Sequence, residues 1–272
     1  MEEGEFMVIS FDLDGVVMYS AMSSGAFRFM ENEIAKWIRK EEDISQEEAI
    51  NKVWEYLHEV SGKMRAEEEF VDGYNWQKII PIVQKKLGMN KTIDFNYLIW
   101  KSCKENKGYT YPGVRRVLED FQDRNLNLIA TTNGLSSYQY PCLEALDLKK
   151  YFQKVITIDY TGYAKPRQEA FSAGEIFSAP RVHIGDSLLQ DIGGANNAGW
   201  CSILYWPGMP ESTQKKSYWR RSLGEKHFKE IEDMKDKGLL ELYNLNKENL
   251  FPDAIIAHMN EMPQLISEIQ DK

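Results

Sequence analysis

Four short polar segments of this sequence bring together residue types that could do chemistry. In chain order they are Asp12-Leu13-Asp14-Gly15, Thr132-Asn133-Gly134, Lys165-Pro166 and Gly185-Asp186-Ser187, the last followed by Asp191. They supply carboxylates, a hydroxyl group and a primary amine. Each segment alone is weak evidence for a site, because Asp-Gly and Asn-Gly are common turn dipeptides and an aspartate often caps a helix.

The interpretation changes if the four segments meet. Two carboxylates about 4 Å apart repel each other by roughly 4 kcal/mol at an effective dielectric constant near 20, so these aspartates could not all converge and stay ionised unaided. A hard divalent cation would remove the repulsion, and oxygen ligands with room for water suit Mg²⁺. With the metal and the Lys165 ammonium group, the pocket could accept a phosphate. Backbone N–H groups that follow Thr132 into a helix would add donors for the anion.

Each segment follows a predicted strand. Phe6 to Phe11 is a short apolar run that ends at Asp12, which is typical of a strand buried on both faces. After Tyr111, helices alternate with further strands, which we expect at Leu126–Thr131, Lys154–Ile158, Arg181–Ile184, Cys201–Tyr205 and Asp253–Ala257. The helices expected between these strands include Gln168–Phe177 and Leu189–Ala198. This alternation predicts an α/β fold with a doubly wound parallel sheet, and such sheets bind ligands at the carboxyl ends of their strands.

Residues 19–108 have a different pattern. Apolar residues recur there at helical spacing, and Ser45 with Glu48 forms a capping box that starts one helix. We therefore expect an all-helical cap domain at residues 19–108, inserted into a core of residues 1–18 and 109–272. Within that core, residues 207–251 form an insertion before the last β-α unit.

Composition narrows the classes of partner. The 272 residues include 33 Lys and Arg against 42 Asp and Glu, a net charge of −9, whereas a nucleic-acid partner usually needs a basic face. The sequence has no apolar run of about 18 residues that could span a membrane. It begins with Met1–Glu5, which lacks the basic start of a signal peptide, so we expect a cytoplasmic protein. Cys103, Cys142 and Cys201 are expected to be free thiols.

Together, these segments resemble the haloacid dehalogenase superfamily. The first motif, Phe11 to Val17, and the last, Gly185 to Ile192, are specific when they occur together. The similarity covers about residues 7–14 and 111–205 and resumes at residues 252–269. It implies a Rossmann-like core and a Mg²⁺-dependent phosphatase that acts on a small phosphate monoester.

The resemblance also implies roles for single residues. Asp12 would be the nucleophile, Asp14 the general acid and then base, and Thr132 would hold the transferring phosphoryl group, with Asn133 and Gly134 beside it. Lys165 would bridge the phosphoryl group to Asp12. Mg²⁺ would be bound by Asp12, the backbone carbonyl of Asp14 and Asp186, with Asp191 supporting the waters of the metal.

Other reactions of the same superfamily fit less well. A phosphonate-cleaving relative would place a lysine early in the cap, and the candidate here, Lys36, lies in an ordinary helical pattern. Sugar phosphomutase relatives tend to carry Glu-Asp at the last motif, where this chain has Gly185-Asp186. Phosphomutase or nucleotidase-type activity remains an alternative, as does a catalytically silent protein that binds a phosphorylated ligand.

Specificity should come from residues outside these motifs. Arg28, in the first cap helix, is the candidate for substrate binding, with Lys63, Arg65 and Tyr74 as weaker candidates; for each, a solvent-facing position is the simpler interpretation. Arg220 and Arg221 in the insertion could reach a distal anionic group, although a peripheral or dimer-forming helical hairpin is favoured. The sequence leaves open whether the protein is a monomer or a homodimer.

Overall fold

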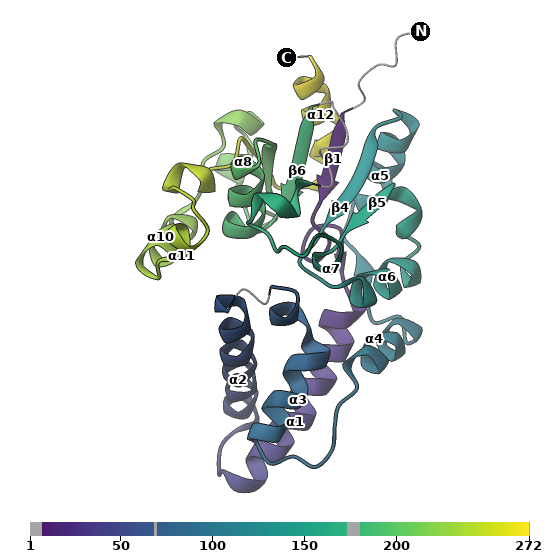
Figure 1. Ribbon diagram of the computed structural model, residues 1–272. Helices are drawn as coiled ribbons and strands as arrows, with labels where there is room; N and C mark the ends of the chain where they lie inside the picture. Colours follow the sequence, from purple (N-terminus) through teal and green to yellow (C-terminus); the bar gives the residue numbers. More distant parts are fainter. Residues whose placement is uncertain (1–6, 68–69, 173–179, 272) are drawn as a thin grey trace.

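The computed structural model describes residues 7–67, 70–172 and 180–271. Its centre is a six-stranded sheet with the strand order β5-β4-β1-β6-β7-β8, and every neighbouring pair is parallel (Figure 1). The strands are β1 (Val8–Phe11), β4 (Asn127–Thr131), β5 (Lys154–Ile156), β6 (Arg181–Gly185), β7 (Cys201–Tyr205) and β8 (Ala254–Ile256). The chain winds from β1 through β4 to β5 and then from β6 to β8 on the other side. This confirms the predicted doubly wound sheet.

Successive residues of the strands belong to different apolar layers, which explains their near-continuous apolar sequences. In β1, Ile9 and Phe11 belong to the main hydrophobic cluster, whereas Val8 packs in a second cluster with Phe171 and Trp200. Because side chains alternate between the two faces of a strand, both faces of the sheet are covered. The covering helices of the core include α5 (Val114–Asp123), α6 (Ser136–Ala145), α8 (Gly194–Asn197) and α12 (Met262–Gln270).

The strand order reverses at β1. Phe11 is in register with Ala130 of β4 on one side and with Ile184 of β6 on the other. The segments that follow these three strands therefore emerge together at one edge of the sheet. In doubly wound sheets this switch point is where a crevice for a ligand forms.

The segment between β1 and α5 is mainly helical. It contains α1 (Phe27–Glu41), α2 (Gln46–Ala66), α3 (Trp76–Lys86) and α4 (Phe95–Lys104), and Ser45 caps α2 through the expected capping box with Glu48. A two-stranded antiparallel ribbon of β2 (Met18–Tyr19) and β3 (Tyr109–Thr110) joins its two ends. Figure 1 shows these helices grouped apart from the sheet, beyond the carboxyl end of β1.

Residues 207–251 pack against the core around β7 and β8. They form α9 (Glu211–Gln214), α10 (Glu225–Asp236) and α11 (Leu239–Leu242), and Ile231 and Leu240 share a hydrophobic cluster with Leu204 of β7. Arg221 is buried and donates to Glu261 at 2.7 Å and to the carbonyl oxygen of Ile255 at 2.9 Å. The hypothesis that Arg221 reaches a substrate is wrong, because Glu261 already neutralises it and fixes the insertion to the core.

Local details differ from the expectations. The helix expected at Gln168–Phe177 is a short 3₁₀ turn at Gln168–Ala170, and its later part lies outside the described residues. The helix expected from Leu189 begins at Leu188 as a π-helical turn and continues as α8. All three cysteines are free thiols, as expected.

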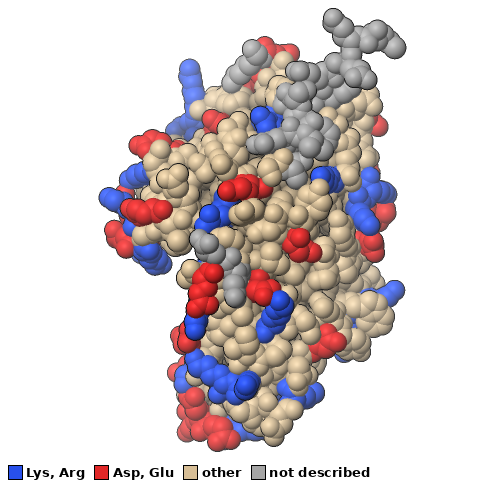
Figure 2. All heavy atoms as spheres, viewed as in Figure 1, with Lys and Arg blue, Asp and Glu red and all other residues tan. Residues whose placement is uncertain are grey.

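Among the described residues, no helix is both long and apolar enough to cross a membrane. On the face shown in Figure 2, Lys and Arg side chains are scattered among Asp and Glu and do not gather in one patch.

Candidate active site

A cavity of about 200 Å³ lies at the switch point of the sheet. Of the predicted site residues, Asp12, Asp14, Thr132, Asn133, Gly134, Asp186 and Asp191 line it. They come from the segments after β1, β4 and β6, so the structure brings together groups that are up to about 180 residues apart in the chain. Residues of the helical segment, including Met22, Tyr74 and Trp76, line the rest.

Asp12 lies at the tip of β1, where its backbone N–H donates to the carbonyl oxygen of Ile184 at 2.8 Å. The turn that follows needs glycine at position 15. Gly15 has a φ of +93°, and a Cβ atom there would lie 2.2 Å from Oδ2 of Asp186. The Asp-x-Asp-Gly sequence thus lets the turn after β1 approach the turn after β6.

Lys165 lies beneath the cavity and is 2% exposed. Its Nζ donates to Asp12 Oδ1 at 2.6 Å, to Asp191 Oδ1 at 2.5 Å and to the carbonyl oxygen of Thr131 at 2.9 Å. Burial alone would lower the pKa of Lys165, but the charges of Asp12 and Asp191 raise it above the ordinary value. Lys165 is therefore a fixed cation with all three of its N–H groups in use.

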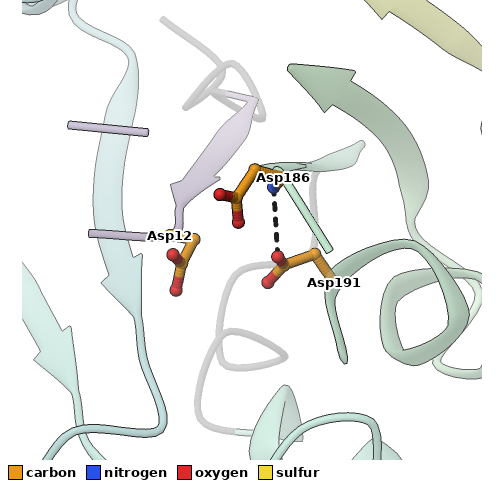
Figure 3. A group of neighbouring side chains, drawn as sticks. All are labelled: Asp12, Asp186 and Asp191. Atoms are coloured by element: carbon orange, nitrogen blue, oxygen red, sulfur yellow. Dashed lines mark hydrogen bonds between the residues drawn. The ribbon is translucent and has the colours of Figure 1, made fainter. Parts of the chain in front are cut away.

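Asp191 is the most heavily hydrogen-bonded of the carboxylates. Its Oδ2 accepts from the backbone N–H group of Asp186 at 3.1 Å (Figure 3) and from that of Ser187 at 3.0 Å. Its Oδ1 faces Lys165 and His183. Burial opposes ionisation, but Lys165 and His183 outweigh it and lower the pKa of Asp191. A Cβ atom on Gly185 would lie 2.1 Å from the Cβ of Asp191. Asp191 therefore holds the turn that carries Asp186.

Asp12 and Asp186, the other two carboxylates of Figure 3, have fewer cations and hydrogen-bond donors around them than Asp191 has. Burial, with the neighbouring Asp191, raises the pKa of Asp186 to about 6, although this side chain is exposed at the rim. Burial also raises the pKa of Asp12, and Lys165 opposes that rise. Oxygen atoms of Asp12, Asp186 and Asp191 lie within 4.8 Å of one another. Such an all-oxygen cluster with excess negative charge fits a hard divalent cation.

Asp14 is held by a residue that the sequence did not reveal. Gln139 of α6 donates from Nε2 to Asp14 Oδ2 at 2.8 Å. The other oxygen, Oδ1, is buried and has no hydrogen-bond partner among the described residues. Burial raises the pKa of Asp14, and the bond from Gln139 opposes the rise. A carboxyl group with a raised pKa and one uncommitted oxygen is suited to proton transfer.

The segment after β4 is organised around two side chains. The Thr132 hydroxyl oxygen accepts from the backbone N–H of Gly134 at 3.1 Å. The side chain of Asn133 clamps the lysine loop, because Oδ1 accepts from the Lys165 backbone N–H at 2.7 Å and Nδ2 donates to the Lys165 carbonyl oxygen at 3.1 Å. Its amide is therefore committed to fixing Lys165.

The sequence analysis also did not predict a network of buried polar side chains beneath the site. The Ser10 hydroxyl contacts the Thr131 hydroxyl at 2.9 Å and His183 Nδ1 at 2.9 Å, and His183 Nε2 lies 3.1 Å from Asp191 Oδ1. Burial lowers the pKa of His183. A neutral imidazole would donate from Nε2 to Asp191 and accept from Ser10 at Nδ1. The sequence did indicate such a network, because Ser10 and His183 are polar residues inside strongly apolar strands and need hydrogen-bond partners when buried.

The predicted specificity residues are only partly at the site. Tyr74 lines the cavity, whereas Arg28 is exposed and lines a separate surface depression with Asn32 and Lys101. The prediction that Arg28 reaches the pocket is wrong. Met22 lies in a π-helical turn, Met22–Ala26, and lines the cavity, whereas Arg28 lies in the α-helix that follows and lines the other depression. Lys63 and Arg220 are exposed and do not line the cavity.

Comparisons with known proteins agree with this geometry. Residues 6–199 match the family model described as haloacid dehalogenase-like hydrolase. A ribulose-1,5-bisphosphate 5-phosphatase from Halopiger xanaduensis is 32% identical over 100 residues, which span 35% of this chain and 42% of that protein's length. A phosphoglycolate phosphatase from Shigella dysenteriae is 27% identical over 213 residues, 72% of this chain and 79% of that protein.

The fold is found in solved structures. The structure of a HAD phosphatase from Thermococcus onnurineus has a TM-score of 0.63 at 20% identity, and the match covers 96% of this chain and 97% of that one.

Proposed function

Because the chain belongs to the haloacid dehalogenase-like hydrolases, we propose that it is a Mg²⁺-dependent phosphatase that cleaves a small phosphate monoester through an aspartyl-phosphate on Asp12. The observation that carries the proposal is the contact of 2.6 Å between Lys165 Nζ and Asp12 Oδ1, beside a cavity that Asp14 also lines. An ammonium group favours the ionised, nucleophilic form of the carboxylate against the effect of burial, and the second acid is available for the leaving group.

Two other features support the proposal. The relatives from Halopiger and Shigella are named as phosphatases of small phosphorylated metabolites, and the cavity of about 200 Å³ is of a size for such a ligand. We assign residues 1–18 and 109–272 to the catalytic core, with residues 207–251 as an insertion within it. Residues 19–108 then form a cap that covers the site and limits the access of water.

The chemistry follows from the positions of four side chains. A carboxylate oxygen of Asp12 attacks phosphorus, while Asp14 gives its proton to the departing alkoxide, which leaves as an alcohol. Asp14, now ionised, takes a proton from water as that water attacks the phosphorus of the aspartyl-phosphate. The second step releases inorganic phosphate and restores both Asp12 and the protonated Asp14. Thr132 and Lys165 hold the charge of the phosphoryl group during both steps.

Asp12, the backbone carbonyl of Asp14 and Asp186 would hold Mg²⁺, since the oxygens of Asp191 are occupied by four hydrogen-bond donors. When bound, the ion would offset the charge of the carboxylates and of the phosphate. Asp191 would then act by fixing the loop of Asp186.

Asp186→Asn is expected to raise the melting temperature of the metal-free protein at neutral pH. The pKa of Asp186 is raised to about 6 from a usual value of 3.8, so the folded state binds its proton more tightly than the unfolded chain. The wild type therefore loses folding stability as the pH rises from the usual pKa of 3.8 to the raised pKa of about 6. Asparagine does not ionise, so Asp186→Asn does not lose this stability.

Melting curves from pH 4 to 8, with and without Mg²⁺, test this expectation, and exposed Asp123→Asn serves as the control. The advantage of Asp186→Asn should disappear below about pH 4, where the carboxyl group is protonated in both states. Mg²⁺ should stabilise the wild type more than Asp186→Asn. Equal stabilisation of the two proteins would remove Asp186 from the proposed metal site.

Phosphate release from an aryl phosphate and from a panel of metabolite phosphates tests the function itself. We expect turnover with Mg²⁺ and its loss, by a factor on the order of 100 or more, when a chelator replaces the metal. Turnover of a sugar bisphosphate to an isomer without phosphate release would favour a phosphomutase. The absence of any turnover across the panel would favour a protein that only binds phosphorylated ligands.

A further inference from the structure

Two arginines from different parts of the chain stack on aromatic rings of one cap turn. Arg65, in the last turn of α2, has its Cζ atom 5.4 Å from the ring centroid of Tyr74. Arg167, two residues after Lys165, has its Cζ atom 4.3 Å from the ring centroid of Phe70. Phe70 and Tyr74 both belong to the segment that links α2 to α3. One guanidinium group therefore comes from the cap and the other from the core.

Neither guanidinium group forms an ion pair with a carboxylate in the part of the chain that the structure describes. Arg65 donates from Nε to the carbonyl oxygen of Ser61 at 3.4 Å, which is a long bond. Arg167 has a buried Nε with no hydrogen-bond partner among the described residues. Arg221 shows the contrast, since it pairs with Glu261 at 2.7 Å. Two partly buried guanidinium groups without a counter-ion among the described residues are unusual in a chain whose net charge is −9.

Both guanidinium groups are connected, through one other residue, to the cavity of the candidate active site. Tyr74, under Arg65, lines that cavity, and its hydroxyl oxygen accepts from Asn133 Nδ2 at 3.4 Å. Asn133 in turn fixes the loop that leads from Lys165 to Arg167. Tyr74 thus connects the cavity to Arg65, and the loop held by Asn133 connects it to Arg167.

The insertion contributes to the same region. Burial raises the pKa of Tyr243, the charge of Tyr74 adds to the rise, and the charges of Arg65 and Arg167 oppose it. The phenol of Tyr243 is therefore within electrostatic range of both guanidinium groups. In Figure 1 the α10–α11 hairpin extends from the core on the same side as α2.

We propose that Arg65 and Arg167 form a second anion-binding site, which holds a carboxylate or a second phosphate of the substrate. This proposal rests on the proposed phosphatase function and narrows its substrate class to phosphate monoesters with an additional anionic group. A carboxylate or a phosphate would accept the unpaired N–H groups and supply the missing negative charge. Stacking on Phe70 and Tyr74 alone would leave Nε of Arg167 unsatisfied.

Matched pairs of substrates test the proposal. One series contains ω-carboxyalkyl phosphates of increasing length, beginning with phosphoglycolate, and the other contains hydroxyalkyl phosphates of the same lengths. Alkanediol bisphosphates form a third arm, which distinguishes a second phosphate from a carboxylate. The quantity compared is the ratio of kcat/KM for the anionic and neutral member of a pair. An inactive fraction of the enzyme cancels in this ratio, so partial misfolding of a variant does not affect the result.

The wild type is expected to prefer one anionic series, and that series identifies the group bound. Arg65→Gln and Arg167→Gln should each lower the preference by about 10-fold or more, chiefly through KM, as expected for the loss of a charge-assisted hydrogen bond. Arg65→Lys should recover part of it. Arg116→Gln, an exposed arginine on α5, should leave the preference unchanged.

The outcomes separate this proposal from the function on which it rests. A wild type that hydrolyses the neutral esters as well as the anionic ones overturns the second site and leaves the phosphatase intact. An unchanged preference in both glutamine variants also overturns it. A wild type that hydrolyses none of the esters contradicts the phosphatase function and, with it, the substrate class proposed here.

Discussion

Asp12→Asn is expected to lower kcat by a factor on the order of 10⁴ or more, because an amide oxygen cannot form the aspartyl-phosphate. The protein should remain folded. Burial and the neighbouring carboxylates raise the pKa of Asp12, so the change removes a charge that the fold holds at some cost. Lys165 keeps its bonds to Asp191 and to the Thr131 carbonyl oxygen. A steady-state assay on the best substrate, together with a melting curve, measures both effects.

Asp123→Asn is the control for this change, since Asp123 is exposed at the end of α5, and it should behave as the wild type. A phosphatase that retains near-normal turnover with asparagine at position 12 would exclude covalent catalysis by this residue. A protein that fails to fold would instead show that the fold needs the ion pair between Asp12 and Lys165.

Lys165→Met is expected to lower both stability and activity. Lys165 is the cation between Asp12 and Asp191, and its removal leaves two buried carboxylates without that compensation. Breaking a buried ion pair by removing one partner costs about 3–5 kcal/mol, and we expect a loss of that size in the free energy of unfolding in metal-free buffer. Turnover should fall by a factor on the order of 100 or more, because the charge beside the nucleophile is gone.

Denaturant unfolding measures the stability term, and Lys85→Met, at an exposed position of α3, supplies the control. The double variant Lys165→Met with Asp191→Asn should recover part of the stability, since one of the two uncompensated charges is then removed. If Lys165→Met unfolds at the same denaturant concentration as the wild type, the buried ion pair does not stabilise the fold as described.

The parts of this structure that the sequence predicted are those with a simple periodic signal. The strands from Val8 to Ile256 are short apolar runs followed by turn residues, and their alternation with helices fixes a parallel sheet. Once the sheet is known, the polar residues that follow β1, β4 and β6 must share one edge. The convergence of Asp12, Thr132 and Asp186 could therefore be predicted without coordinates.

Contacts that depend on the rotation of a helix or on the path of a long loop could not be predicted. Arg28 was expected at the pocket from its place in the chain, but the side on which a helical residue points was unknown. Gln139 had no distinguishing neighbours in the sequence. Arg167 directly follows Lys165-Pro166, but nothing in the sequence indicated its contact with Phe70. The electrostatic influence of Arg65 on Tyr243 depends on where the insertion lies in the fold. The network of Ser10 and His183, in contrast, could have been predicted, because polar residues inside apolar strands indicate buried hydrogen bonds.

The most direct test of the central claim is to trap the covalent intermediate. The enzyme is mixed with substrate and Mg²⁺, quenched within one turnover and treated with borohydride, which reduces an acyl phosphate to an alcohol. Peptide mass spectrometry should then find homoserine in place of aspartate at position 12, and the modification should be absent when substrate is left out. Homoserine at another position, or unmodified Asp12 during rapid phosphate release, would contradict the account.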